Sequence, residues 1–294
     1  MLRNLAVLAA LALARPALAE PVPADCAALI APLQGLEGYV LAAPPQAPAD
    51  GWCVFDGATL RTPALDRPNV SVERLRLRGS VEAGALVALA VEAEGLRLQP
   101  KAGDRQMDDR LRSILRLQVV DVSLAASLED GVVALRPLIL RLGSGMTLRL
   151  DVEGRAGGLD PAALLAGRLT GLALDWQNDG RSLRPVMEML GERLVDGAKG
   201  SAAVDAARLA LRMLGDNLPE TLFGEDGRSE LAALLAALPH GRGRLHLAFA
   251  AEPGIGAAQV AVLALSGDPA SSEALGRFLD GARLELDWTP GLSP

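Results

Sequence analysis

Hydrophobic and polar residues alternate along residues 69–154, with the period of two that half-buried β-strands show. In the stretch RLRLR at residues 74–78, the leucines share one parity and the arginines share the other. The predicted turns between the strands lie at Gly84, at Gly95, at residues 129–131 (EDG) and at residues 143–145 (GSG). Because tight turns join antiparallel neighbours, the pattern predicts an antiparallel β-meander whose leucine face has to be covered by other elements.

The parity of the apolar positions changes once inside the first of these strands. Val70 and Val72 occupy even positions, whereas Leu75 and Leu77 occupy odd ones. An extra residue near Glu73-Arg74 would bring both pairs to the same face, so we expect a β-bulge there.

Residues 181–239 change to the helical period and form a predicted helical insertion. The apolar positions at helical spacing are Leu183, Val186, Met187, Leu190 and Leu194. Since proline is tolerated only in the first turn of a helix, Pro185 places the start of this helix near Ser182. Further helices are predicted over 202–214 and 229–238, so amphipathic helices are available to cover one face of the sheet.

Two Asp-Pro pairs predict shorter helices. Asp160 would cap a helix whose first turn holds Pro161 and which ends at Gly167. The pair Asp268-Pro269 predicts a second helix by the same device.

The C-terminal part, residues 242–290, alternates again and predicts strands that return to the sheet. The apolar runs at 244–250 and 258–265 are predicted strands, and Gly254-Ile-Gly256 between them is interpreted as a hairpin turn. The predicted fold class is therefore α+β, an antiparallel β-meander with helices over one face and C-terminal strands returning to it.

The stretch LALDW at residues 172–176 returns as LELDW at residues 284–288. In both stretches the tryptophan shares the parity of the leucines, and Asp175 and Asp287 have the opposite parity. We predict two strands of one sheet, each ending in an aromatic side chain, Trp176 or Trp288, that packs on the apolar side. The alternative is that the tryptophans form a platform for a ligand.

The N-terminal residues have the features of a secretory signal peptide. Arg3 precedes the apolar run of residues 5–14, and Ala17-Leu-Ala19 has the small-x-small form of a cleavage site. We predict that residues 1–19 are removed and that the protein is periplasmic or secreted, without an integral membrane span. Removal would change the formal charge from −7 to −9, which disfavours nucleic acid as a partner.

The chain has two cysteines, Cys26 and Cys53. In an oxidising compartment an isolated pair predicts one disulfide bond, and two buried free thiols are the alternative. We therefore expect a disulfide-closed N-terminal segment over 20–60, followed by one α+β domain over 61–294. Since only 3% of the residues are aromatic, the core has to be built from Leu, Val and Ala.

A search for chemical motifs identifies no catalytic, cofactor-binding or metal-binding residues. His240 and His246 have no second ligand at metal spacing, and strand parity places His246 on the face away from the leucines. Two acidic clusters lack the calcium-loop pattern and are interpreted as solvated surface. They comprise Asp104, Asp108 and Asp109 in one segment and Asp216, Glu220, Glu225 and Asp226 in another.

Several segments together give a resemblance to a known group of proteins. They are the signal sequence, the meander from RLRLRGSVEAGALVALAVEAEGLRLQP through MTLRLDVEG, the helical segment LTGLALDWQNDGRSLRPVMEMLGERL and the C-terminal ALGRFLDGARLELDWTPG. By this pattern most of residues 70–290 resembles the AsmA-like exported envelope proteins of Gram-negative bacteria. Those proteins usually keep an N-terminal membrane helix, whereas the corresponding segment here is predicted to be cleaved. The resemblance implies an envelope location and carries over no functional residues.

These patterns lead to three functional hypotheses. The first is a non-enzymatic periplasmic protein that presents an amphipathic sheet to a lipid acyl chain or to a hydrophobic segment of an envelope protein. The second is a structural or assembly factor of the envelope, in which the helices seal the sheet completely. The third is a carboxylate-based hydrolase, which would need two acids facing each other across a cleft.

Overall fold

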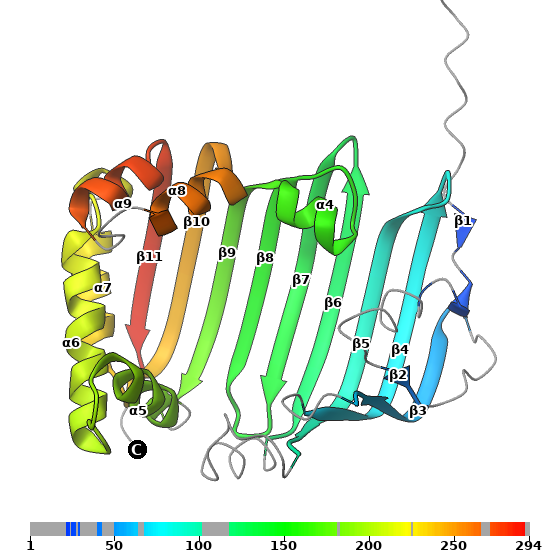
Figure 1. The fold of residues 1–294 in the computed structure, drawn as a ribbon, viewed down its shortest axis with the longest axis horizontal. Helices are drawn as coiled ribbons and strands as arrows, with labels where there is room; N and C mark the ends of the chain where they lie inside the picture. Colours follow the sequence, from blue (N-terminus) through cyan, green and yellow to red (C-terminus); the bar gives the residue numbers. More distant parts are fainter. Residues whose placement is uncertain are drawn as a thin grey trace, which may run out of the picture.

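The fold is α+β, as predicted, and is built on one long antiparallel sheet (Figure 1). The computed structural model describes residues 22–23, 25–27, 29, 40–42, 50–63, 68–101, 118–180, 183–224, 226–265 and 271–291. Strands β2 to β11 lie side by side in chain order, and β1 pairs with β4. Each strand of this series pairs antiparallel with the next, so the connections are those of a meander.

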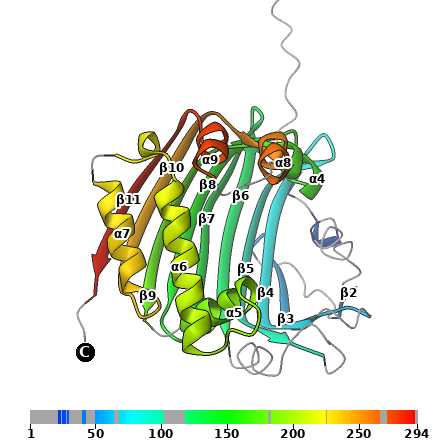
Figure 2. The same ribbon diagram turned by 60° about the vertical axis from the view of Figure 1, so that its left-hand side comes forward.

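The strands are β1 (Val22–Pro23), β2 (Val40–Leu41), β3 (Cys53–Arg61), β4 (Asn69–Glu82), β5 (Ala85–Gln99), β6 (Val120–Glu129), β7 (Val132–Leu142), β8 (Thr147–Arg155), β9 (Arg168–Asp179), β10 (Arg242–Gly256) and β11 (Ala282–Pro290). The helices are α4 (Pro161–Ala166), α5 (Leu183–Leu194), α6 (Ser201–Asn217), the 3₁₀ turn η1 (Glu220–Leu222), α7 (Gly227–Ala237), α8 (Ala257–Leu265) and α9 (Ser272–Phe278). Helices α5, α6 and α7 gather at the β11 end of the sheet, whereas α4, α8 and α9 lie along one end of the strands (Figures 1 and 2).

Most turn and cap predictions are confirmed. Asp130 and Gly131 both have positive φ in the turn between β6 and β7, and residues 143–145 separate β7 from β8. Asp160 accepts a hydrogen bond from the backbone N–H of Ala163 (N to Oδ1, 2.9 Å) and caps α4 as expected. Helix α9 begins at Ser272 with Ser271 as its cap, and the predicted helix start at Asp268-Pro269 lies outside the described residues.

The prediction of a strand over 258–265 is wrong, because residues 257–265 form helix α8. Every residue of this segment except Gln259 is apolar, so its alternation has no polar face and cannot distinguish a strand from a helix. Alanine is the strongest helix former, and the Gln259 side chain accepts a hydrogen bond from the N–H of Gly256 (3.1 Å), which starts the helix. Gly254-Ile-Gly256 is accordingly the irregular end of β10 and not a hairpin turn.

The parity change in β4 is real, but the predicted bulge at Glu73-Arg74 is wrong. Val72 and Leu75 are both buried, with two exposed residues between them. The register of β4 against β3 is nevertheless the same on both sides of Glu73, since Asp56 pairs with Arg74 and Ala58 with Val72. The neighbouring strands change parity at the same level. Gly57 in β3 and Gly95 in β5 have positive φ (67° and 64°), so Gly95 bends a continuous strand and does not form the predicted turn.

Strand pairing places one apolar row across nine strands. The row consists of Trp288, Leu245, Trp176, Leu148, Leu140, Val122, Ala93, Leu75 and Phe55. The adjacent row on the other face consists of Asp287, His246, Asp175, Arg149, Ile139, Ser123, Glu92, Arg76 and Val54. The predicted division of the sheet into a leucine face and a polar face is therefore confirmed along its length.

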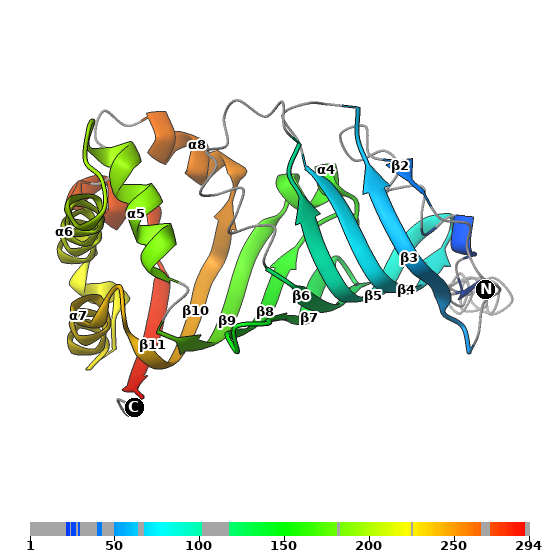
Figure 3. The same cartoon turned by 90° about the horizontal axis from the view of Figure 1, so that it is seen from below.

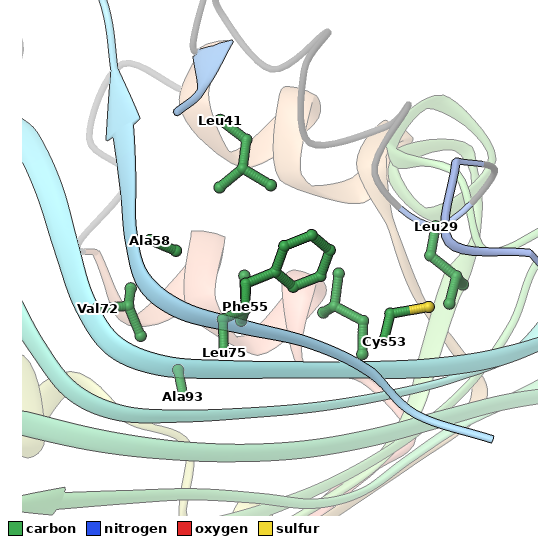
Figure 4. Close-up of a cluster of buried hydrophobic side chains, with 9 residues drawn as sticks. Leu29, Leu41, Cys53, Phe55, Ala58, Val72, Leu75 and Ala93 are labelled. Atoms are coloured by element: carbon green, nitrogen blue, oxygen red, sulfur yellow. The ribbon is translucent and has the colours of Figure 1, made fainter. Parts of the chain in front are cut away.

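The apolar face is closed at its two ends by different elements (Figure 3). At the β3–β5 end, Leu29 and Leu41 pack with Phe55 and Leu75 in a buried cluster (Figure 4). This cluster includes Cys53, whose predicted disulfide bond with Cys26 is present (Cα–Cα 5.6 Å).

At the β11 end, residues of α7 cover the sheet. Leu234 is buried together with Leu245, Leu286 and Trp288, and Trp176 packs against the same cluster. Helices α5 and α6 pack on each other. A second cluster joins them to Leu235 of α7 and to Leu238, which follows α7. In α5 the apolar stripe is narrower than predicted: Met187 is buried, but Val186 and Leu194 are 52% and 51% exposed.

Between these two ends the apolar face is less well covered. None of the residues of β6, β7 and β8 is buried, although Val122, Leu140 and Leu148 belong to the apolar row. The leucine face is therefore sealed at both ends and only half-buried in the middle.

Candidate functional site

An apolar groove opens where the half-buried part of the sheet meets α4 and α8. Its volume is about 630 Å³. Its apolar lining includes Val133, Val152, Leu164, Leu165, Leu169 and Ile255. The residues come from β7, β8, α4, β9 and β10, and α8 contributes Val260 as a further wall residue. The groove is thus formed by elements that are distant in sequence and meet at one end of the sheet.

Local sequence signals build both helical walls. Helix α4 is held by its Asp160 cap and ends at Gly167, whose N–H donates to the carbonyl of Leu164 (3.1 Å). Helix α8 starts directly from the irregular end of β10, where the register against β9 shifts between Ala250 and Ile255. The shift allows β10 to leave the sheet and to turn into a helix beside the groove.

The only charged residues that line this groove are Arg155 and Arg168. They lie directly opposite each other in the register of β8 and β9. Neither side chain forms an ion pair or a hydrogen bond within the part of the chain that the structure describes. Arg155 also lines a hollow on the polar face, so the two arginines stand at the boundary of the groove. Like charges directly opposite each other are unfavourable in a sheet unless an anion lies nearby.

The polar face has a hollow of its own, of about 790 Å³. Its floor consists of small residues, among them Gly171, Ala173, Ala248 and Ala250. Asp151 lines this hollow, and its Oδ2 accepts a hydrogen bond from Arg149 Nε (3.1 Å), whereas its Oδ1 is buried without a partner among the described residues. The hollow exists because the side chains are small, and no group in it is arranged around a common point.

Two acids and a histidine meet in a second polar hollow, of about 430 Å³. His246 lies opposite Asp287 on one side and Asp175 on the other, and its Nδ1 is 2.7 Å from Asp175 Oδ1. The exposed fractions of the His246 and Asp175 side chains are 51% and 56%. Sequence parity correctly placed all three residues on the polar face, but their adjacency follows from the order β9-β10-β11, which no local signal reveals.

This constellation is the observation that supports carboxylate chemistry. Asp175 and Asp287 belong to strands on either side of β10, so their Cα atoms lie about 10 Å apart at two interstrand spacings. Catalytic carboxylates, however, are tuned by burial or by close like charges. The Asp175 side chain is more than half exposed, so these surroundings are those of a surface ion pair.

Several ion pairs lie along the remaining polar face. Arg76 pairs with Glu92 (2.6 Å), and its guanidinium group lies 4.5 Å from the centre of the Trp52 ring. The hydrogen bond that Arg74 donates to Asp56 (2.9 Å), together with the negative charge of that carboxylate, raises the pKa of Arg74. These contacts hold neighbouring strands together, and they engage both Arg74 and Arg76.

The remaining sequence candidates do not come together. Among the described residues, no group of three His, Cys, Asp or Glu side chains is arranged to hold a metal ion. His240 is exposed in the turn after α7. The acidic residues Asp216, Glu220 and Asp226 are exposed, and the cluster Asp104, Asp108 and Asp109, with Glu225, lies outside the described residues.

None of the helices in the described part of the chain combines the length and the hydrophobicity that a membrane span requires.

The sequence matches no protein-family model, and a comparison with curated proteins finds no significant match. The resemblance to AsmA-like proteins therefore stays a prediction that rests on the pattern of the sequence.

Proposed function

We propose that this chain is a non-enzymatic periplasmic protein that binds a lipid acyl chain on the apolar face of its sheet. The observation that carries the proposal is the apolar groove between α4 and α8, which continues onto the half-buried leucines of the central strands. A concave apolar surface with few polar groups is the common form of a site for a hydrophobic ligand.

The size of the groove suits a hydrocarbon chain. Sites for small molecules generally occupy about 300–1,000 Å³, and the groove, at about 630 Å³, lies inside this range. Each methylene group removed from water contributes about 0.8 kcal/mol, so an acyl chain gains affinity with every carbon atom that enters. The lining supplies no polar side chain for a hydrophilic ligand other than those of Arg155 and Arg168 at the boundary.

The disulfide bond supports the proposed compartment. Structural disulfides form in oxidising environments such as the periplasm, and Cys26 and Cys53 are joined in the buried N-terminal cluster. An envelope location is also what the AsmA-like pattern of the sequence would imply.

Two measurements test acyl binding. Lipids extracted from the purified protein are identified by mass spectrometry, and a fluorescent fatty acid is titrated into the delipidated protein. We expect bound lipid in the extract and a dissociation constant on the order of 10 µM for a single chain. The Ala261→Trp variant places a large side chain on the side of α8 that lines the groove. It should weaken binding by at least about tenfold, because the new side chain fills the groove.

The matched control is Ala202→Trp, which adds the same side chain to an exposed alanine of α6, outside the groove. Equal affinities for the two variants would contradict the assignment of the groove. A lipid-free extract combined with no fatty-acid binding would favour the alternative, a structural or assembly factor whose apolar face contacts an envelope protein.

A carboxylate hydrolase is the second candidate, and the row Asp175, His246 and Asp287 is the observation that favours it. Chromogenic glycosides and esters provide the test. Hydrolysis that disappears in both Asp175→Asn and Asp287→Asn, with unchanged stability, would support this function and contradict the non-enzymatic proposal.

A further inference from the structure

We propose that the end of the molecule formed by α4 and α8 docks on an anionic lipid membrane, with exposed leucines inserted between the lipids and two arginines at the headgroups. The inference deepens the proposed function, since it names the source of the acyl chain, and it rests on that function for its biological purpose. It depends on how far the side chains of the two helices at the rim of the groove are exposed, whereas acyl binding depends on the volume of the groove.

Both helices are free of charged residues. Helix α4 reads PAALLA and α8 reads AAQVAVLAL. Large apolar side chains on them are nevertheless exposed: Leu165 is 74% exposed, Val260 is 51% exposed and Leu164 is 45% exposed. Contiguous exposed apolar side chains without interleaved charge are typical of surfaces that meet a protein partner or a membrane.

The topology brings these side chains to one place. Helix α4 connects β8 to β9, and α8 follows β10, so both stand at the same end of three adjacent strands (Figures 1 and 2). Leu164, Leu165 and Val260 all line the same groove. The apolar surface and the groove are therefore continuous, and a chain that leaves the bilayer at this surface would enter the groove without crossing water.

The two arginines that line the groove favour an anionic membrane over an apolar protein segment. The whole chain carries a formal charge of −7, and the exposed turn at Asp130 lies next to Ala156 of the groove, yet the charged residues that line the groove itself are two arginines and no acid. Arg155 and Arg168 face each other without a partner among the described residues, which an anionic headgroup would supply. Asp160 caps α4 beside the groove, where its Oδ1 accepts a hydrogen bond from the N–H of Ala163. Basic residues are attracted to an anionic membrane surface, and apolar side chains add to the attraction by inserting between the lipids.

Helix α6 offers a comparison within the same molecule. Its Leu209 is 60% exposed and its Met213 is 57% exposed. These residues alternate with exposed charges of both signs, among them Asp205 and Arg212, so this helix lacks the charge-free surface that insertion requires.

Vesicle flotation of the full-length protein tests the proposal. The probes are vesicles of pure phosphatidylcholine and vesicles that also contain phosphatidylglycerol. We expect binding to the anionic vesicles that weakens as salt is added, and little binding to the zwitterionic ones. Leu165→Asp should weaken binding by at least about tenfold, since it places a charge at the inserted position. Arg155→Gln and Arg168→Gln should each weaken it by about fivefold.

The controls share the chemistry but not the location. Leu209→Asp changes an exposed leucine of α6, and Arg244→Gln changes an exposed arginine at the opposite end of β10 from α8. Both should bind anionic vesicles as the unchanged protein does. Because the substituted side chains are exposed, urea unfolding should show that all the variants remain folded.

Docking is contradicted if the unchanged protein does not float with anionic vesicles, or if Leu165→Asp and Leu209→Asp weaken binding equally. The proposed function fails separately, through the absence of fatty-acid binding in a vesicle-free titration. A protein that floats but takes up no fatty acid would be a membrane-docking protein that carries no lipid, whereas the converse would be a carrier that receives its ligand elsewhere.

Discussion

Trp176 and Trp288 end the same sequence pattern but are covered to different extents. Trp288 is 5% exposed and belongs to the cluster under α7, whereas Trp176 is half-buried at the margin of that cluster. Their strands are separated by β10, so they are two strands apart and not neighbours. The prediction that both point to the apolar side of one sheet is confirmed.

Replacing the tryptophans should reveal this difference. We expect Trp288→Ala to lower the free energy of unfolding by about 4 kcal/mol, because it leaves a cavity in the cluster. Trp176→Ala should cost about half as much, since part of its side chain already contacts water. Urea unfolding of both variants measures the two values, and equal losses would mean that Trp176 is covered as fully as Trp288.

On the other face, Asp175 and Asp287 are expected to contribute little to stability. The Asp175–His246 contact is short (2.7 Å), but both side chains are more than half exposed and water weakens their attraction. Asp175→Ala and Asp287→Ala should each change the free energy of unfolding by less than about 0.5 kcal/mol. A double-mutant cycle with His246→Ala provides the coupling, and a coupling above about 1.5 kcal/mol would show that the row is an organised site.

At the scale of elements, two glycines inside helices should respond to alanine in opposite directions. Gly191 of α5 is buried against α6, and a methyl group there would overlap the backbone of Ala203. Gly276 of α9 has no atom close to the position of an added methyl group. Alanine normally stabilises a helix interior relative to glycine by about 0.5–1 kcal/mol.

We therefore expect Gly276→Ala to raise the free energy of unfolding by about 0.5 kcal/mol and Gly191→Ala to lower it by about 2 kcal/mol or more. Thermal or urea unfolding gives both signs in one experiment. Stabilisation by Gly191→Ala would contradict the close crossing of α5 and α6.

The same scale shows where local patterns are reliable. Helix α4 was predictable because Asp160, Pro161 and Gly167 act on their own neighbours in the chain. Helix α8 was not, because an apolar segment without polar positions has no period, and its structure depends on how β10 leaves the sheet. At Gly95 the sequence predicts a turn where the structure has a bend, since only the neighbouring strands show that β5 continues through it.

For the whole molecule, the N-terminal segment is expected to depend on its disulfide bond. Cys53 is buried with Phe55 and Leu77, and Cys26 packs against the same cluster. Closing a loop of 27 residues stabilises the folded chain by about 3 kcal/mol on the chain-entropy account. Cys26→Ala/Cys53→Ala should lower the free energy of unfolding by that amount, and reductant should shift the urea midpoint of the unchanged protein but not that of the variant.

The sequence by itself determined the two faces of the sheet, the meander and the disulfide pair. Each depends on period, on turn residues or on there being two cysteines, and such signals act locally or by count. Only the tertiary structure decided which leucines are covered. Coverage depends on where α7 and the N-terminal segment come to rest, and these contacts join residues far apart in the chain. The tertiary structure also decided three further features, namely the half-buried centre, the groove beside α8 and the row around His246. Alternation places a side chain on a face but does not show what lies opposite it.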